Sequence, residues 1–352
     1  MFQSNLFDNS VRYDGKFLST RFQGSKLKIV PWIWSCIQHL KFDTCLDAFG
    51  GTGSVAYYLK KMQKEVDYND NLQFNYTIGK AIIENDETKL ENDEIDFIIS
   101  PHDDVTYQTF IKDTFRDIFF LDEENGWLDM VVTNIRLLDD EYKRAIAFTA
   151  LFQACIIKRP YNLFHRANLY MRTAEVKRSF GNKTTWDKPF PEYFRVFAQE
   201  VNSIIFSNGR SNRALYKDVF NVEPGYDLVY MDTPYINAKG TGVDYLDFYH
   251  FLDGMLDYDN WGKRITQIYK HKRLKGDKSL WCQPNKIHDA FDRLFRHFKD
   301  SLLVISYRSH GIPSQDELVE ILSKYKSVTL HKVDYKYVLS KNNGQEILLV
   351  GV

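Results

Sequence analysis

Cysteine is scarce in this sequence, and long apolar runs are missing. The most apolar run, Ala145 to Ile157, is too short to span a bilayer and predicts a buried helix instead. Residues Met1 to Asn5 lack the charged and apolar segments of a secretion signal. The four cysteines have no metal-ligand spacing, so we expect no bound metal and buried free thiols in a reducing cytoplasm: Cys36, Cys45, Cys155 and Cys282.

Two common phosphate-binding motifs are also missing. Neither G-x-G-x-x-G nor G-x-x-x-x-G-K-[ST] occurs, which disfavours pyrophosphate cofactors and nucleoside triphosphates. A different glycine turn is present, because Cys45 to Phe49 reads as a buried strand and Val55 to Leu59 as the start of a helix. Between them, Gly51 and Gly53 can adopt positive φ and let a ligand approach the backbone. The turn favours a nucleoside without a diphosphate, and S-adenosylmethionine is the obvious candidate.

An acidic residue follows this turn at an informative spacing. Asp67 lies about 20 residues after Asp47, in the next apolar stretch, Glu65 to Asn69. In open α/β sheets, a carboxylate at this place can accept hydrogen bonds from ribose hydroxyls. An Asp at a strand end is also common as a helix cap or turn residue, so both interpretations stay open.

The segment Asp232-Thr233-Pro234-Tyr235 carries the chemistry. An adenine amine is a poor nucleophile, because its lone pair is delocalised, so an enzyme must accept hydrogen bonds from both N–H groups. Asp232 supplies one acceptor, and Pro234 restricts Thr233 to extended conformations that fix its carbonyl as the second. Tyr235 offers a flat face on which an extruded base can stack. Together with the glycine turn and the preceding buried strand, Tyr226 to Met231, the segment predicts methyl transfer to an adenine amine.

These motifs resemble those of Dam-like N6-adenine-specific DNA methyltransferases, in the group whose cofactor loop precedes a catalytic D-P-P-Y. The resemblance covers most of the chain outside residues 90–160. It implies direct in-line transfer from S-adenosylmethionine to a flipped adenine in duplex DNA, without a covalent enzyme intermediate. It also implies that Phe22 and Lys26 flank the cofactor, with Lys26 on the methionine carboxylate. The further cofactor positions that it implies are Asp47, Phe49, Gly51, Gly53, Ser54, Asp67, Asp218, Val219 and Asp232. Less diagnostic motifs are matched by Tyr249 to Leu252, by Ser306-Tyr307 and by Glu346 to Val350.

One position departs from the family pattern, which usually has Pro where this chain has Thr233. The carbonyl is retained, so we expect activity to survive, but a catalytically silent DNA-binding relative stays open. A cytosine N4-methyltransferase uses similar chemistry, yet more often has Ser at the position of Asp232. An RNA or small-molecule methyltransferase would keep the cofactor loop without needing basic tracts around an insertion.

The formal net charge of −1 conceals an uneven distribution of charge. Residues 84–104 are acidic and are expected to face away from DNA, whereas residues 158–188 and 263–278 are rich in Lys and Arg. Such clustering is typical of phosphate binding, although a charge run by itself more often marks a solvated surface. Arg and Lys can read guanine, and Asn can read adenine, in the major groove. The candidate DNA contacts are Arg166, Arg172, Asn182, Lys183, Lys270, Lys272 and Arg273.

The order of elements indicates an α/β protein with a Rossmann-like S-adenosylmethionine-dependent methyltransferase fold. We expect a doubly wound sheet with a C-terminal antiparallel hairpin, for which Asn342-Asn343-Gly344 is the turn signal. Residues 1–94 and 213–352 would form the catalytic domain, and residues 95–212 an inserted, mostly helical target-recognition domain. Strands are predicted at Thr44–Phe49, Lys64–Tyr68, Ala214–Tyr216, Asp227–Asp232, Leu302–Ser306, Val328–Asp334 and Glu346–Val350.

The resemblance also implies a biological setting. Double-stranded DNA is the expected partner, without a membrane, and a cognate restriction endonuclease is a further candidate partner. We expect a monomer on DNA, in the cytoplasm of a prokaryotic or viral system.

Overall fold

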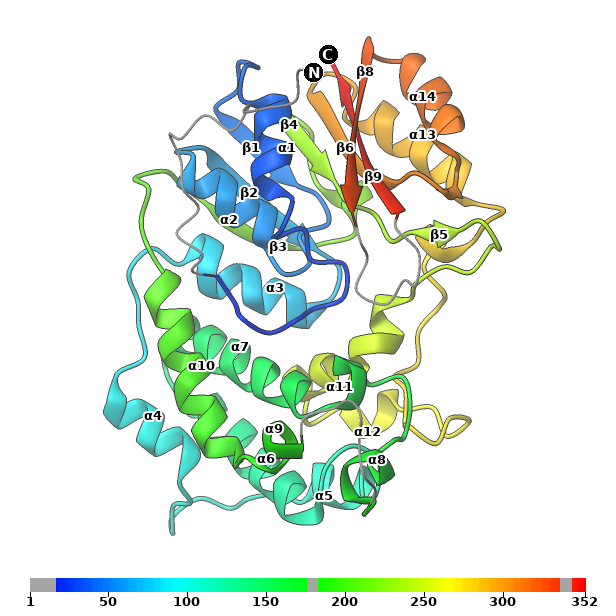
Figure 1. Cartoon of the computed structure of the whole chain (residues 1–352). Coiled ribbons are helices and arrows are strands. Elements are labelled where there is room, and N and C mark those ends of the chain that lie inside the picture. The colour runs from blue at the N-terminus through cyan, green and yellow to red at the C-terminus, as the bar shows by residue number, and fades with distance from the viewer. Residues whose placement is uncertain (1–16, 176–182, 336–343) are drawn as a thin grey trace, which may run out of the picture.

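The computed structural model describes residues 17–175, 183–335 and 344–352, and a seven-stranded sheet forms its centre (Figure 1). The strand order is β3-β2-β1-β4-β6-β9-β8. The first five of these strands are parallel, and β9 lies antiparallel between β6 and β8. A separate two-stranded ribbon pairs β5 with β7. The bounds are β1 Thr44–Asp47, β2 Glu65–Asp70, β3 Arg213–Tyr216, β4 Leu228–Met231, β5 Ile236–Asn237, β6 Leu302–Arg308, β7 Gly311–Ile312, β8 Val328–Tyr335 and β9 Gly344–Gly351.

The strands of the large sheet lie where the sequence predicts them, with ends that shift by one or two residues. β1 stops at Asp47, because the glycine turn follows. β2 continues to Asp70, since its parallel register with β3 extends to the pair of Asp70 with Tyr216. The predicted C-terminal hairpin is confirmed, because β8 and β9 pair antiparallel.

Both faces of the sheet are covered by helices. Successive strand residues point to opposite sides, so each strand supplies apolar side chains to both faces. Cys45 and Tyr230 pack into one core with α1, α2 and α3. Leu46 and Val229 pack into a second core with α13 and α14 on the other face. The sheet is therefore doubly wound, as predicted. The bounds of these helices are α1 Val30–Ile37, α2 Ser54–Lys61, α3 Gln73–Gly79 with its extension η1 Lys80–Glu84, α13 Ile287–His297 and α14 Gln315–Ser323.

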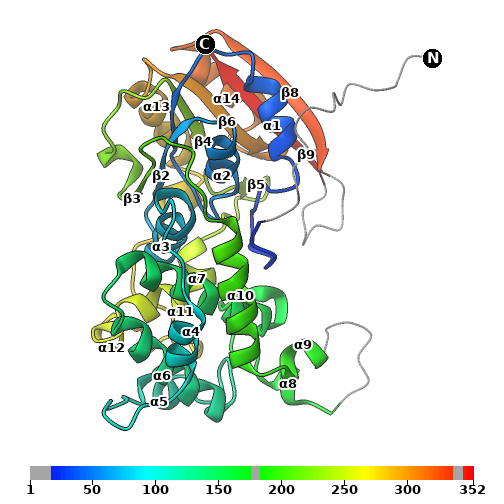
Figure 2. The ribbon, with the colours of Figure 1, turned by 90° about the vertical axis from the view of Figure 1, so that its left-hand side faces the viewer.

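A helical lobe lies beneath the sheet in both ribbon views (Figures 1 and 2). The described part of residues 95–204 contributes only helices and loops to it, in agreement with the predicted helical character. Its apolar run from Ala145 to Ile157 is a buried helix, as predicted. The bounds are α4 Asn92–Ile99, α5 Phe110–Thr114, α6 Asp122–Arg136, α7 Glu141–Ile157, η2 Pro160–Asn162, α8 Tyr170–Thr173, α9 Lys183–Asp187 and α10 Phe190–Ile204.

The lobe also includes two helices that follow the catalytic segment, α11 (Tyr245–Leu256) and α12 (Trp261–Arg264). Phe251 of α11 stacks on Phe164 with ring centroids 5.1 Å apart, and the Trp261 ring of α12 lies 4.9 Å from that of Phe115. The lobe is therefore larger than the predicted insertion at residues 95–212, because its core takes aromatic side chains from two stretches of chain. Within the described residues, no helix combines the length and apolar character needed to cross a bilayer.

The lobe buries a cluster of charged side chains. The Arg172 guanidinium donates two hydrogen bonds of 2.8 Å to the Glu124 carboxylate, and Lys158 Nζ lies 2.8 Å from the same carboxylate. The Arg172 side chain is only 4% exposed. The prediction that Arg172 contacts DNA is therefore wrong, because its guanidinium is enclosed and already paired with Glu124.

We expect Arg172→Ala to lower the free energy of unfolding by about 3–5 kcal/mol, because breaking a buried ion pair leaves charge without its partner. The matched control is Arg166→Ala at an exposed position, which should change stability by no more than about 0.5 kcal/mol. Urea unfolding of both variants measures this difference. Equal stability of the two variants would contradict the structural role of Arg172.

Candidate active site

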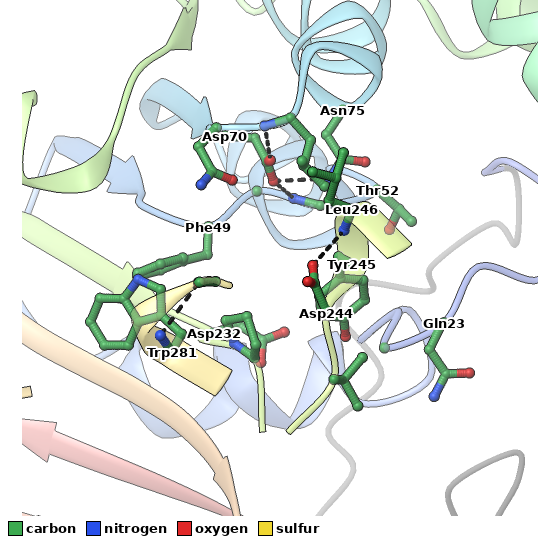
Figure 3. Close-up of a pocket in the computed structure, with 18 of the residues that line it drawn as sticks. Gln23, Phe49, Thr52, Asp70, Asn75, Asp232, Asp244, Tyr245, Leu246 and Trp281 are labelled. Carbon is green, nitrogen blue, oxygen red and sulfur yellow. Dashed lines mark hydrogen bonds between the residues drawn. The ribbon is translucent and has the colours of Figure 1, made fainter. Parts of the chain in front are cut away.

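A cavity of about 310 Å³ opens at the carboxyl ends of β1, β2 and β4, where doubly wound sheets bind ligands (Figure 3). Its lining comes from the segment before α1, the glycine turn, the end of β2 and the catalytic segment. Residues 243–246, Asp277 and residues 279–282 add to the lining from the chain that enters and leaves the helical lobe. The sheet therefore brings together the two motifs that the sequence places about 180 residues apart.

The glycine turn is held in place by Tyr68 of β2. A Cβ atom on Gly50 would lie 2.0 Å from the Tyr68 ring, so only glycine fits there. The Tyr68 hydroxyl donates to the Gly51 carbonyl at 2.6 Å. Gly51 and Gly53 have φ values of 52° and 75°, as the sequence predicts for this turn. Gly51 and Ser54 line the cavity, whereas Gly53 is the N-cap of α2 and is not among the described lining residues.

The carboxylate that faces the cavity from β2 is Asp70 rather than Asp67. Asp70 lines the cavity and accepts a hydrogen bond from the Gly51 N–H at 3.0 Å. Asp67 lies earlier in the strand, where it accepts hydrogen bonds from Arg213 Nε at 3.0 Å and the Tyr226 hydroxyl at 2.6 Å. The prediction that Asp67 lies at the cofactor site is wrong, because β2 is longer than predicted and its carboxyl end is Asp70.

The catalytic segment meets two distant parts of the chain at the end of β4. Asp232 Oδ2 accepts a hydrogen bond from Lys26 Nζ at 2.6 Å, and Asp232 Oδ1 accepts one from the Tyr235 hydroxyl at 2.9 Å. Glu346 Oε1 on β9 lies 2.5 Å from the same hydroxyl and 3.5 Å from Lys26 Nζ. A lysine and a tyrosine therefore lie between two carboxylates.

The other predicted catalytic residues surround this contact. Pro234 lines the cavity, whereas Thr233 is buried and only 2% exposed. The Tyr235 ring packs edge-on against Tyr307, with centroids 4.8 Å apart, and Lys26 Nζ lies 4.9 Å from its centroid. Neither Thr233 nor Tyr235 is among the described residues that line the cavity, so their contacts with a target base stay predictions.

The cavity is strongly acidic. Burial raises the pKa of Asp232 to about 6, and it raises the pKa of Asp70 to about 6. Burial and the charge of Asp232 raise the pKa of Asp47 to about 8. A cationic ligand would favour the ionised forms of these groups. Among the described lining residues, Lys26 is the one basic side chain, against six aspartates: Asp47, Asp70, Asp218, Asp232, Asp244 and Asp277.

One side of the cavity is aromatic. Figure 3 shows Phe49 and Trp281 together there, and their ring centroids lie 5.1 Å apart in an edge-on contact. Asp218 lines the cavity just before the short helix η3 (Val219–Asn221). Phe22 and Val219 are buried in the cores on the two sides of the sheet and are not among the described lining residues. The contacts of these two residues with the cofactor therefore stay predictions.

The predicted DNA-contact residues differ in accessibility. Arg166, Lys183 and Lys270 have exposed side chains, and Lys272 is partly exposed. These positions are open to a large ligand such as DNA, and their contacts stay predictions. Asn182 lies outside the described residues.

Arg273 has a structural partner instead. Its guanidinium lies 2.8 Å from Asp244 and 3.0 Å from Asp247, and its side chain is 17% exposed. Arg273 therefore fixes residues 265–274 to the start of α11. Two carboxylates lie beside its guanidinium, and its contact with DNA stays a prediction.

The chain matches the family model of the D12 class N6 adenine-specific DNA methyltransferases over residues 22–321, a range that contains every described residue lining the cavity. It belongs to this family. Membership fixes the reaction class as methyl transfer to the N6 amine of adenine in DNA, and methyltransferases in general use S-adenosylmethionine. Family membership still leaves open one alternative from the sequence, namely that this chain is a catalytically silent relative.

Similar proteins carry names from restriction-modification systems. The chain is 30% identical to the Type II methyltransferase M2.HphI of Haemophilus parahaemolyticus, over 94% of this chain and 96% of that protein. It is 23% identical to the Type II methyltransferase M.NlaIII of Neisseria lactamica, over 89% of this chain and 90% of that protein. It is also 23% identical to M.FokI of Planomicrobium okeanokoites, over 92% of this chain but half of that longer protein.

Several residues at the cavity escaped the sequence reasoning. Asp70 follows directly after the acidic stretch ending at Asn69, so a strand extended by two residues would have identified it. Glu346 lies in a motif matched to the family, but nothing local indicated its contact with the catalytic segment. Tyr245 and Trp281 carry no local signal, because they reach the cavity only through the fold of the helical lobe.

Proposed function

We propose that this protein is an active, site-specific methyltransferase that transfers the methyl group of S-adenosylmethionine to the N6 amine of a flipped adenine in duplex DNA. One observation carries the proposal. Asp232, at the end of β4, lines the same acidic cavity as the glycine turn that follows β1. A methyl donor and a hydrogen-bond acceptor for an amine therefore have room side by side.

The residues of the cavity fit S-adenosylmethionine. Its sulfonium and ammonium groups are cationic, and the cavity has an excess of carboxylates. Asp47 Oδ1 is buried and accepts no hydrogen bond from any residue that the structure describes, so it suits the ammonium group. We assign Asp70 to the ribose hydroxyls, Phe49 and Asp218 to the adenine, and Lys26 to the methionine carboxylate. When bound, the cofactor supplies a methyl group activated by the positive sulfonium.

Asp232 acts on the target amine. Its carboxylate accepts one N–H hydrogen bond, and the Thr233 carbonyl accepts the other, which localises the lone pair of the nitrogen. As the methyl group is transferred, the sulfonium would become the neutral thioether of S-adenosylhomocysteine and positive charge would develop on the amine, where an ionised Asp232 stabilises it. Loss of one amine proton, which the Asp232 carboxylate can accept and pass to solvent, then gives N6-methyladenine. The Tyr235 ring supports the base. Thr233 replaces the usual Pro without removing the backbone carbonyl, and this is the reason to expect an active enzyme.

The turn after α7 offers a fixed DNA-facing element beside the cavity. Tyr161 and Asn162 have φ values of 62° and 61°, which non-glycine residues rarely adopt. Asn162 Nδ2 donates to the Arg21 carbonyl at 3.1 Å, so the turn touches the segment that continues into the cavity wall. The buried Arg159 guanidinium donates to the Arg166 carbonyl at 2.9 Å and holds the other end.

The side chains of this turn suit a duplex in which one base has been rotated out of the helix. Tyr161 is 53% exposed, and Arg166 beside it is an exposed cation. Extrusion of adenine costs a few kcal/mol, and an aromatic ring that fills the vacated stack can offset part of that cost. We assign Tyr161 to this role and Arg166 to a phosphate.

Its relatives suggest the biological setting. Because M2.HphI and M.FokI are Type II methyltransferases by name, we propose that this chain modifies DNA beside a cognate restriction endonuclease. We further propose that it acts in the cytoplasm as a monomer on DNA.

The activity itself is tested by modification sequencing of duplex DNA incubated with the protein and S-adenosylmethionine. We expect N6-methyladenine at one short motif, and we expect Asp232→Ala to lower kcat/KM by at least about 10²-fold while the cofactor still binds. In the wild type, kcat/KM should fall below pH 6, because protonation of Asp232, whose pKa is about 6, removes the acceptor charge. Cofactor binding without any methylation would identify a silent relative instead.

Asp70→Asn should weaken S-adenosylhomocysteine binding by roughly 10- to 100-fold, because a hydrogen bond to a charged group contributes about 1.5–3 kcal/mol. Asp67→Asn is the matched control in the same strand. It should leave the affinity unchanged, since Asp67 bonds to Arg213 and Tyr226 away from the cavity. Isothermal titration calorimetry measures both affinities, and a larger loss for Asp67→Asn would reverse the assignment.

Tyr161→Ala should reduce kcat/KM for duplex DNA by about tenfold, since stacking on a base contributes about 1–3 kcal/mol. Tyr161→Phe should keep most of the activity because it retains the ring. Tyr170→Ala is the control, because Tyr170 is another exposed aromatic residue of the same lobe, 69% exposed on α8. Fluorescence of 2-aminopurine at the target position reports flipping, and an equal signal for Tyr161→Ala and the wild type would exclude this role.

A further inference from the structure

A buried carboxylate on β9 lies behind the catalytic segment and has no role in the mechanism above. Glu346 is 0% exposed. Its Oε1 lies 2.5 Å from the Tyr235 hydroxyl, 2.7 Å from the Ser306 hydroxyl and 3.5 Å from Lys26 Nζ. Two of these three neighbours, Tyr235 and Lys26, also bond to Asp232. Glu346 is thus linked to the catalytic carboxylate through two shared donors.

The hydroxyl of Tyr235 cannot donate a full hydrogen bond to both carboxylates. It carries a single hydrogen, and its contact with Glu346 is the shorter one, 2.5 Å against 2.9 Å to Asp232. A charged acceptor makes a hydrogen bond roughly twice as strong as a neutral one. An ionised Glu346 therefore competes with Asp232 for this hydrogen.

The Lys26 ammonium also interacts with both carboxylates. It lies 2.6 Å from Asp232 Oδ2 and 3.5 Å from Glu346 Oε1, in a site where its side chain is 5% exposed. An ammonium that bonded only to Asp232 would neutralise the charge needed at the target amine. The negative charge of a second carboxylate, 3.5 Å from the ammonium, offsets part of the effect of the ammonium on Asp232.

We infer that Glu346 is a positioning residue for methyl transfer, which draws the Tyr235 hydroxyl and part of the Lys26 charge away from Asp232. Asp232 thereby keeps lone pairs and negative charge for the amine of the target adenine. The inference rests on the proposed catalytic role of Asp232. Strand β9 thus contributes to catalysis through Glu346, which lies in the core and does not touch the base.

The inference predicts a change in pH dependence. Burial is the main cause of the raised pKa of Asp232, Lys26 opposes it, and the charge of Glu346 raises it further. Glu346→Gln keeps the side-chain shape and an acceptor oxygen but removes this charge, so the pKa of Asp232 falls. The other groups that face Asp232 are not substituted in this variant: Lys26 before α1, Asp47 in β1, Tyr230 in β4, Tyr235 in the catalytic segment and Tyr245 in α11.

The test compares kcat, KM for DNA and the pH profile of kcat/KM in the wild type, Glu346→Gln, Tyr235→Phe and the double variant. Glu346→Gln should lower kcat by about tenfold or more, up to roughly 10²-fold as for a misplaced catalytic group, without changing KM. Its acid limb should move to lower pH. Tyr235→Phe removes a donor from Asp232, so it should move the acid limb to higher pH, and the double variant should lie between the two.

A purely structural role for Glu346 would produce a different pattern. Glu124→Gln is the matched control, because Glu124 is another largely buried carboxylate beside a buried lysine, Lys158, and lies far from the catalytic segment in sequence. It should lower the melting temperature and leave kcat and the acid limb unchanged. An unchanged kcat and acid limb in Glu346→Gln would overturn the inference.

Tyr235→Phe gives an independent check if Glu346→Gln does not fold, and a shift of its acid limb to lower pH would also overturn the inference. An inactive wild type would instead overturn the proposed function together with the inference.

Discussion

The ammonium of Lys26 is the interaction on which the site depends. It lies almost fully buried between Asp232 and Glu346, and a buried charge is tolerated only when it is paired and hydrogen-bonded. The three residues come from the segment before α1, the end of β4 and the C-terminal hairpin. Their pairing holds the first of these segments against the sheet, where it forms one wall of the cavity. Removing the lysine would leave Asp232 and Glu346, whose carboxylates both contact the Tyr235 hydroxyl, close together without a cation between them.

The acidic cavity does not conflict with the negative charge of DNA, because the cavity and the DNA-facing surface are different parts of the protein. The six aspartates line a cavity that suits a cationic cofactor and a reaction in which an amine becomes positively charged. Phosphates of DNA would meet the outer surface, where Arg166, Lys183 and Lys270 are exposed. Screening limits the reach of surface charges to about 8 Å at physiological ionic strength, so an acidic interior need not repel the duplex. The net charge of −1 is thus a poor guide to DNA binding.

The helical lobe shows why runs of basic residues are ambiguous. In the tract from Lys158 to Lys188, the side chains of Lys158, Arg159 and Arg172 are buried. Long basic side chains bury their methylene groups easily, and Arg159 satisfies its guanidinium with carbonyl oxygens, including those of Phe119 and Arg166. The tract therefore supplies fewer accessible cations than its sequence indicates, and its buried members stabilise the lobe that presents the remaining ones.

The sequence by itself determined the features that depend on neighbouring residues. The strands of the large sheet, the glycine turn and the segment from Asp232 to Tyr235 could be read from it, because local periodicity and backbone restriction specify them. Only the tertiary structure decided which side chains reach the cavity. The register of β2 with β3 places Asp70 rather than Asp67 at its edge, aromatic packing adds α11 and α12 to the helical lobe, and the pairing of β9 with β6 brings Glu346 to the catalytic segment. These contacts join residues far apart in sequence, so no local pattern encodes them.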